Sequence, residues 1–386
     1  MKIVIIIRVC SFDVGSAAER QLDALVIGAG PAGVGTGLAM MLVDDLVFGV
    51  VERGRVGETF RRWPERMRFL TPSFTGNAFG AIDLNAVHPE TSPAHTLKVD
   101  YPSGAGYAHY LESVGQHFGV PVRERCGVLA VEPSATGYTV VTSEGPVPAR
   151  TVVWAAGEFG TPSRPPIPGN ELGVHSAKPA AWQAPDEAPV VVIGGYESGI
   201  DVACALVADG HPVTVLDPSS PWEATGSDPS LTLAPRTRQR LHHAESSGLL
   251  ELAGKHEATA IEHDGTQYVV DAGRTRFRSP VAPVLATGFR PTMGPVAELF
   301  DRRSDGWPLV TGDDESTIAP GVFLAGPAVR HDDLHLCFVY KFRQRFAHLA
   351  KVIGDRLGRD TTALEAYRAV GMLVEDVSCC AQDCAC

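Results

Sequence analysis

Short apolar runs alternate with polar and glycine-rich stretches along most of the chain. Four of these runs have the length and the residue types of buried strands, and they lie at residues 24–27, 46–51, 190–193 and 213–216. The first and the third each lead into a glycine-rich turn and then into a helical stretch of small or apolar residues. The repeated order of strand, glycine turn, helix and strand predicts an α/β protein with parallel sheets.

The first glycine turn has the residue order of a dinucleotide-binding loop. Its first glycine permits the tight turn, its second lets the backbone approach a pyrophosphate, and its third allows the helix to pack closely on the strand. The next strand ends in Glu52, 24 positions after Gly28, where a carboxylate can bind ribose hydroxyls. The dinucleotide contacts expected from this region are Gly28, Gly30, Pro31, Ala32, Gly33 and Glu52.

The second glycine turn departs from the fingerprint at one position. Tyr196 stands where the middle glycine is usual, so that either the loop bends differently or the nucleotide lies further out. The following strand ends in Asp217, whose carboxylate would bind ribose hydroxyls and repel a 2′-phosphate, which favours NADH over NADPH. Arg236, Arg238 and Arg240 could instead favour a phosphate, or form a solvated helix face. The expected contacts are Gly194, Gly195, Tyr196, Glu197, Ser198, Gly199 and Asp217.

Composition narrows the class of partner. The 386 residues are 44% hydrophobic and 20% charged, which suits a soluble protein with a sizeable core and two or three domains. A formal charge of -12 argues against nucleic acid and against anionic membranes, both of which attract basic patches. We therefore expect a small-molecule substrate, no nucleic-acid or membrane partner, and a homodimer as the candidate assembly.

The first residues of the chain do not have the features of an export signal. Residues 1–10 are mostly apolar, but the run is short, is interrupted by Arg8 and lacks a small-residue cleavage site, so it is interpreted as a frayed or extra strand. No other run approaches the ~20 apolar residues that span a bilayer. A cytoplasmic location is expected.

Residues after the first fold resemble the FAD half of flavin-dependent monooxygenases and of their low-molecular-weight thioredoxin-reductase relatives. That resemblance implies that the segment after Glu52 packs along the flavin, the alternative being that its aromatic residues are ordinary core residues. It also implies that two Ala-Thr-Gly-type strands and a late Gly-Pro pair line the FAD, with Pro327 where the family usually has Asp. The residues concerned are Arg53, Glu58, Thr59, Phe60, Trp63, Ala156, Gly157, Thr287, Gly288, Gly326 and Pro327.

The resulting fold class is α/β, with two Rossmann-like dinucleotide-binding domains, the second inserted into the first. A proline-dense connector at 161–169 marks a hinge. The expected division is 1–158 and 285–356 for the FAD-binding domain, 159–284 for the NAD(P)-binding domain, and 357–386 for a C-terminal extension. The expected cofactors are FAD and NADH or NADPH.

The electron acceptor is less well specified by the sequence. Disulfide reductases of the resembled superfamily need a pair of redox cysteines beside the flavin. The pair is spaced as CxxxxC after the first glycine turn or as CxxC in the second domain, and neither is present. Gly173 and His175 resemble, with compressed spacing, a signature of flavin-containing and Baeyer-Villiger monooxygenases, although His175 could equally cap a connector. His331, His335 and Cys337 follow the segment that ends in Gly326 and Pro327, which the resemblance places along the FAD. These three residues are the candidate catalytic residues. The i, i+4 spacing of the two histidines could also hold a metal.

The last residues form a cysteine-rich tail. Four thiols in eight positions suit a soft metal ion, and the candidate ligands are Cys379, Cys380, Cys384 and Cys386. The Ser-Cys-Cys-Ala portion looks like the C-terminal cysteine pair of mercuric reductase, whose inner cysteine pair is missing here.

Three hypotheses follow. The first is an NAD(P)H-dependent FAD enzyme that is monooxygenase-like and oxidises a small molecule. The second is a flavin-dependent reductase of thiol, disulfide or thiophilic-metal acceptors that uses the tail. The third is a metal-binding or redox-sensing flavoprotein.

Overall fold

The computed structural model describes residues 21–75, 81–226, 228 and 230–377, and it divides into two compact units. The first unit contains the described residues of Met1–Arg61, Thr71–Glu158 and Pro291–Asp383. The second contains Arg62–Leu70 and the described residues of Phe159–Arg290. Most of the second unit is therefore inserted in the sequence of the first.

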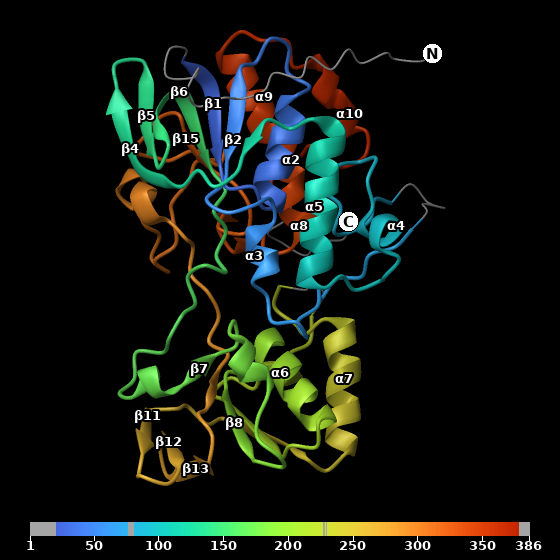
Figure 1. The fold of residues 1–386 in the computed structure, drawn as a ribbon, viewed down its shortest axis with the longest axis vertical. Helices are drawn as coiled ribbons and strands as arrows, with labels where there is room; N and C mark the ends of the chain where they lie inside the picture. Colours follow the sequence, from blue (N-terminus) through green and yellow to red (C-terminus); the bar gives the residue numbers. More distant parts are fainter. Residues whose placement is uncertain (1–20, 76–80, 227, 229, 378–386) are drawn as a thin grey trace. The chain divides into compact units, whose positions relative to one another are not determined.

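The first unit is a mixed sheet with helices packed on it (Figure 1). The strand order is β3-β2-β1-β6-β5-β4, and β15 pairs with the end of β6. Strands β1, β2, β3, β15 and the end of β6 are parallel, whereas β4 and β5 pair with β6 as an antiparallel meander. The bounds are β1 Leu22–Ile27, β2 Phe48–Val51, β3 Val122–Arg123, β4 Val128–Ser134, β5 Gly137–Thr142, β6 Gly145–Trp154 and β15 Val322–Leu324.

Helix α2, Pro31–Met40, connects β1 to β2 and contacts α5 and α9. Nine of its ten residues are buried, which small side chains allow because neighbouring helices can approach its backbone. In Figure 1 it runs beside β1 and β2. The remaining α-helices of this unit are α3 Glu58–Arg61, α4 Pro93–Leu97, α5 Gly104–Phe118, α8 Val339–Phe342, α9 Phe346–Arg356 and α10 Glu365–Arg368.

The second unit has a parallel five-stranded sheet in the order β10-β9-β8-β14-β7. An antiparallel sheet of three strands, β11-β12-β13, accompanies it. The bounds are β7 Val174–His175, β8 Val190–Ile193, β9 Val213–Asp217, β10 Leu250–Gly254, β14 Val284–Leu285, β11 Ala260–His263, β12 Tyr268–Ala272, β13 Thr275–Ser279, α6 Glu197–Ala208 and α7 Pro235–Ser246.

Both predicted sequences of strand, glycine loop, helix and strand are present, as β1-α2-β2 and β8-α6-β9. Strands β1 and β8 are buried along their whole length, and β2 and β9 are buried at most positions, as expected for parallel strands covered on both faces. The α/β class with parallel-stranded sheets is confirmed. In the part of the chain that the structure describes, no helix combines the length and the apolar character needed to cross a bilayer.

Short elements complete the chain. A two-stranded sheet joins β16, Arg330–His331, to β17, Leu334–His335. The 3-10 helices are η1 Asn170–Leu172, η2 Pro179–Trp182, η3 Pro221–Glu223, η4 Gly294–Leu299, η5 Arg343–Arg345 and η6 Thr362–Leu364.

Candidate functional site

The first glycine loop is shaped for an anionic ligand. A Cβ atom added at Gly30 would meet no atom within 4 Å, whereas one at Gly33 would lie 1.7 Å from the carbonyl oxygen of Gly28. Gly30 therefore leaves space beside the loop, and Gly33 permits close packing of the helix against the loop. Helix α2 has no side-chain cap and no acidic residue in its first turn, so its N-terminal N-H groups can bind a phosphate.

Glu52 holds the loop from the end of β2. Its carboxylate accepts hydrogen bonds from Ala29 N (2.9 Å) and from Gly54 N (2.9 Å), and its side chain is buried. A carboxylate with one backbone bond on each oxygen still has lone pairs for hydroxyl donors. This geometry fits the ribose of a dinucleotide whose pyrophosphate lies at the N-terminus of α2.

Two further loops converge on the same end of the sheet. Ala155 N, just after β6, donates to Ile27 O at the end of β1 (2.8 Å), and Ala325 N, just after β15, donates to Trp154 O (2.9 Å). A Cβ at Gly326 would lie 2.9 Å from the Cβ of Ala32 in α2. The loops after β1, β6 and β15 thus surround the N-terminus of α2, where an open α/β sheet binds its ligand.

The aromatic residues predicted along the flavin are packed in two different units. Phe60 is buried in the first unit, with its ring centroid 4.9 Å from that of Tyr107. Trp63 belongs to the second unit, where its centroid lies 5.3 Å from Phe69 and 6.0 Å from Phe159. Both side chains therefore have packing partners of their own. Contact of either with a flavin remains a prediction, as it does for Arg53, Glu58 and Thr59.

The second glycine loop repeats the geometry of the first. Gly195 N donates to Asp217 Oδ2 (2.8 Å), as Ala29 N does to Glu52, and a Cβ at Gly199 would lie 1.9 Å from Gly194 O. The other carboxylate oxygen of Asp217 accepts from Ser219 N and Oγ. The carboxylate at the end of β9 therefore occupies the place that Glu52 occupies at the end of β2.

Tyr196 keeps the backbone conformation of the glycine that it replaces. Its φ and ψ are -88° and -164°, against -78° and -170° for Gly30. The side chain extends to Thr232, whose carbonyl oxygen accepts from the Tyr196 hydroxyl (2.9 Å). The tyrosine is therefore accommodated without a different loop bend. The sequence allowed either a different loop bend or a nucleotide that lies further out. The second of these stays a prediction.

Glu197, the first residue of α6, binds the start of α7. Its carboxylate accepts from Ala234 N and, at 2.6 Å, from Thr237 Oγ1. Burial raises the pKa of this carboxyl, and the two hydrogen bonds oppose that shift. Because the carboxylate is used in this contact, it is not a free group of the nucleotide loop.

Two of the three arginines that could bind a 2′-phosphate instead contact other residues of the second unit. Arg238 donates to Leu233 O (3.1 Å) and Ala224 O (2.6 Å), and Arg240 forms an ion pair with the buried Asp201. These contacts disfavour phosphate binding by Arg238 and Arg240, and they also show that neither side chain is free on a solvated helix face.

His175 has structural partners at both ring nitrogens. Its Nδ1 accepts from Ala177 N (3.1 Å), and its Nε2 lies 3.0 Å from Gly288 O, which requires a proton on Nε2. Burial lowers the pKa of the imidazole, which keeps it neutral. His175 therefore fastens the connector to the end of β14. Thr287 contributes similarly, since its Oγ1 donates to Ser163 O (2.6 Å).

His331 and His335, whose i, i+4 spacing could have held a metal, do not share a helical face. They lie on β16 and β17, where His331 pairs with Leu334 and His335 with Arg330. Asp332 has φ 48° and begins the two-residue turn between the strands. Because neighbouring positions in a strand alternate between faces, the two imidazoles leave opposite sides of the hairpin. They do not form the predicted metal-binding pair. Cys337 is exposed just beyond it.

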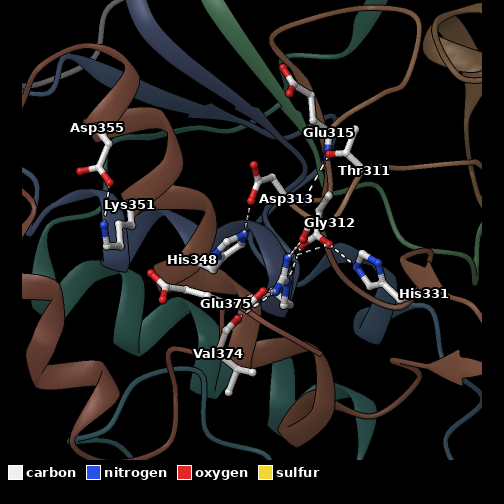
Figure 2. A network of polar contacts seen from close by, with 12 residues as sticks. Thr311, Gly312, Asp313, Glu315, His331, His348, Lys351, Asp355, Val374 and Glu375 are labelled. Carbon is white, nitrogen blue, oxygen red and sulfur yellow. Dashed lines mark hydrogen bonds and ion pairs between the residues drawn. The ribbon is translucent and has the colours of Figure 1, made fainter. Parts of the chain in front are cut away.

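His331 belongs instead to a buried polar network (Figure 2). Asp314 accepts from His331 Nε2 (2.6 Å) and from Arg345 Nε (2.8 Å), and its own side chain is fully buried. Arg345 also donates to Val374 O and Glu375 O, each at 2.8 Å. This cluster fastens the segment before β15 to the β16–β17 hairpin and to the C-terminal segment.

Glu158 is a candidate residue that the sequence analysis missed. It follows Gly157 after β6, in the predicted flavin-lining loop, and burial raises the pKa of its carboxyl to about 7. The charge of Arg330 opposes that shift. The only sequence signal was its place directly after the Ala-Ala-Gly strand.

No group of three or more His, Cys, Asp or Glu side chains suited to a metal ion occurs among the residues that the structure places. The tail ligands Cys379, Cys380, Cys384 and Cys386 lie outside the described residues. Cys126 and Cys204 are buried in different units, and burial raises the pKa of both thiols, that of Cys204 to about 12.

A family model described as pyridine nucleotide-disulphide oxidoreductase matches residues 25–326. A curated relative, the uncharacterized CzcO-like oxidoreductase of Geobacillus kaustophilus, is 28% identical over 199 residues, which are 50% of this chain and 53% of the relative. Two CzcO oxidoreductases from Bacillus match over similar shares. The chain thus spans about half the length of these relatives.

Solved structures share the fold. The bacillithiol disulfide reductase of Staphylococcus aureus has a TM-score of 0.69 at 18% identity, over 87% of this chain and 99% of that chain. The flavin-containing monooxygenase of Stenotrophomonas maltophilia has a TM-score of 0.69 at 19% identity, over the same shares. At these identities the likeness concerns the fold alone.

Proposed function

The chain belongs to the pyridine nucleotide-disulphide oxidoreductase family, and from that premise we propose that it is an FAD-dependent, monooxygenase-like enzyme. In this proposal NADH supplies the electrons, oxygen accepts them and a small molecule is oxidised. The observation that carries it is the repeated loop geometry: each unit has one glycine loop whose backbone N-H is held by a carboxylate at the end of the next strand.

The first unit is the one that fits FAD. Gly30 leaves space for the pyrophosphate, the first turn of α2 offers N-H donors, and Glu52 is placed for the adenosine ribose. Bound FAD would supply two-electron transfer between NADH and the acceptor. The protein's part is to bind and orient the cofactor, to exclude water and to move protons.

The buried cysteines favour oxygen over a disulfide as the acceptor. Catalytic exchange with a disulfide requires a thiolate, and burial raises the pKa of both Cys126 and Cys204. The two thiols also belong to different units, without the close spacing of a redox pair.

The proposal is tested by reducing the purified, FAD-loaded protein with NADH in the absence of oxygen. Oxygen is then added with and without candidate small-molecule substrates, and substrate oxidation is compared with hydrogen peroxide release. Rapid reduction followed by oxygen-dependent product formation supports the proposal. Failure of NADH and NADPH to reduce the bound FAD contradicts it.

The four tail cysteines favour a second candidate, a reductase of thiol, disulfide or thiophilic-metal acceptors. A chain truncated after Asp376 separates the two candidates. In the oxygen-dependent enzyme, truncation leaves turnover unchanged and removes only tight binding of a soft ion such as Hg²⁺. In the tail-dependent reductase, truncation stops turnover with disulfide or metal acceptors while NADH still reduces the flavin.

Asp217 is expected to make NADH the better donor by about tenfold or more in kcat/KM, because its charge would face a 2′-phosphate. Asp217→Asn should narrow that preference, since the amide keeps an acceptor oxygen and loses the charge. Glu223→Gln, an exposed carboxylate on nearby η3, is the matched control and should leave the ratio unchanged. A wild-type preference for NADPH would contradict the assignment.

A further inference from the structure

Glu158 lies on the side of the first glycine loop that faces away from Glu52. Its loop follows β6, and β6 pairs with β1 on the side opposite to β2. The loop is fixed at two points: Ala155 N donates to Ile27 O (2.8 Å), and Thr292 N donates to Gly157 O (2.8 Å). Glu158 therefore directly follows a segment that is anchored at the carboxyl edge of the sheet, where ligands of such sheets bind.

The two ends of a dinucleotide on this edge can be told apart. Glu52 marks the ribose of the adenosine half on the β2 side, and α2 receives the pyrophosphate in the middle. The other half of FAD, which carries the reactive ring, must then extend toward the loops after β6 and β15. The first of these loops carries Glu158, and the second leads into β16, which begins at Arg330.

Among the described residues, nothing donates a hydrogen bond to the Glu158 carboxylate, and Arg330 is the charged group that faces it. The Arg330 guanidinium is engaged elsewhere. It lies 3.4 Å from the Trp307 ring centroid and donates to Asp305 Oδ2 (2.9 Å). A partly buried carboxyl left without a partner is suited to giving up and regaining a proton rather than to holding the fold together.

The proposed reaction needs a proton that NADH does not carry. NADH transfers two electrons and one proton as hydride, and incorporation of one oxygen atom into a substrate S follows NADH + H⁺ + O₂ + S → NAD⁺ + SO + H₂O. The hydride supplies one hydrogen of the water, and the second must come from solution. Some group near the reacting ring has to deliver it.

We propose that Glu158 is the catalytic acid that delivers this proton to the oxygen atom leaving as water, and that solvent then reprotonates its carboxylate. The inference rests on the proposed FAD- and oxygen-dependent function. The pKa of about 7 keeps the Glu158 carboxyl protonated in a large share of molecules at neutral pH. The carboxyl of an ordinary exposed glutamate is ionised at that pH.

The two half-reactions of the full-length, FAD-loaded protein test the role directly. The oxygen half-reaction of the wild type should slow as pH rises through about 7. Glu158→Gln should slow it by roughly 100-fold and abolish that pH dependence, with the defect confined to this half-reaction. Glu298→Gln, an exposed carboxylate on η4 of the same unit, is the control and should behave as wild type. A Glu158→Gln protein that keeps the wild-type pH profile overturns the proposal.

Thermal unfolding supplies a measurement that does not depend on turnover. A carboxyl whose pKa is raised from 4.5 to about 7 by folding contributes stability at low pH that is lost as pH rises through 7. Glu158→Gln should therefore melt above the wild type at pH 8, and the gap should close as the pH falls toward 5. Arg330→Gln should move the midpoint of the loss to higher pH, because the opposing charge is gone.

A gap between Glu158→Gln and wild type that does not change with pH overturns the assignment of a proton-exchanging carboxyl. The two failures are distinguishable. If NADH cannot reduce the bound flavin, the proposed function is wrong, whereas a normal oxygen half-reaction in Glu158→Gln refutes only the role of Glu158.

Discussion

Gly30→Val is expected to give a folded protein that is isolated without FAD. The added side chain meets no atom within 4 Å of its Cβ, so the protein without cofactor can accept it. The same space is needed by the pyrophosphate at the N-terminus of α2. We expect FAD affinity to fall by roughly 100-fold or more, which corresponds to about 2.7 kcal/mol. Flavin absorbance after reconstitution and a direct binding titration measure the loss.

Two other glycines provide controls for this result. Gly115→Ala, on α5, also places its Cβ in open space and should keep normal FAD binding. Gly33→Val should prevent folding altogether, because its Cβ would lie 1.7 Å from Gly28 O. A Gly30→Val protein that retains stoichiometric FAD would show that the pyrophosphate lies elsewhere, and the assignment of the first unit would fall.

Asp314→Asn is expected to destabilise the first unit by about 3 to 5 kcal/mol. This is the cost of removing the negative charge from the buried Asp314–Arg345 ion pair while the positive charge stays. The substitution leaves the Arg345 guanidinium charged and buried, and it turns an amide toward N-H donors that need an acceptor. The midpoint of denaturant unfolding, followed by a probe of the first unit, measures the effect.

Asp355→Asn is the matched control, since it breaks the exposed Lys351–Asp355 pair on α9 of the same unit. Pairs of this kind contribute about 0.5 kcal/mol or less. Removing both buried charges together, as Asp314→Leu with Arg345→Met, should recover part of the loss because no unpaired charge remains. If Asp314→Asn unfolds at the wild-type midpoint, the network does not stabilise the unit.

The features that the sequence predicted well depend on residues close together in the chain. A strand, three spaced glycines, a helix and an acid about two dozen positions later follow from local backbone requirements, and both copies appear as expected. Tyr196 was also identified as an exception. Its tether to Thr232 could not be foreseen, because it depends on how a later segment returns to the loop.

The error at His331 and His335 has an identifiable physical cause. A spacing of four suits a metal where both side chains share a face, as they do on a helix, but the Asp-Asp pair between the histidines is typical of a turn. Aspartate tolerates a positive φ, and Asp332 at φ 48° begins a two-residue hairpin turn. The partner of His331, Asp314, is 17 positions away, and no local pattern links them.

Trp63 illustrates a second limit. Its place in the sequence put it in the first nucleotide-binding region, and the flavin contact implied by the family resemblance stays a prediction. The chain crosses to the second unit at Arg62 and returns after Leu70, so a short excursion changes which core this tryptophan packs in. Hydrophobicity alone cannot assign a residue to one of two cores.

The interrupted sequence of the first unit has a consequence for the order of folding during synthesis. Strand β15 and helix α9, which packs on α2, are translated only after the whole of Phe159–Arg290. The inserted unit is nearly continuous, and its two ends are joined by the Arg290 N to Thr161 O hydrogen bond (2.9 Å). Domains generally fold as units while the chain emerges from the ribosome. The second unit can therefore complete its parallel sheet while the first still exposes the face of α2 that α9 will cover. That apolar face stays open to misassociation until β15 and α9 have been translated.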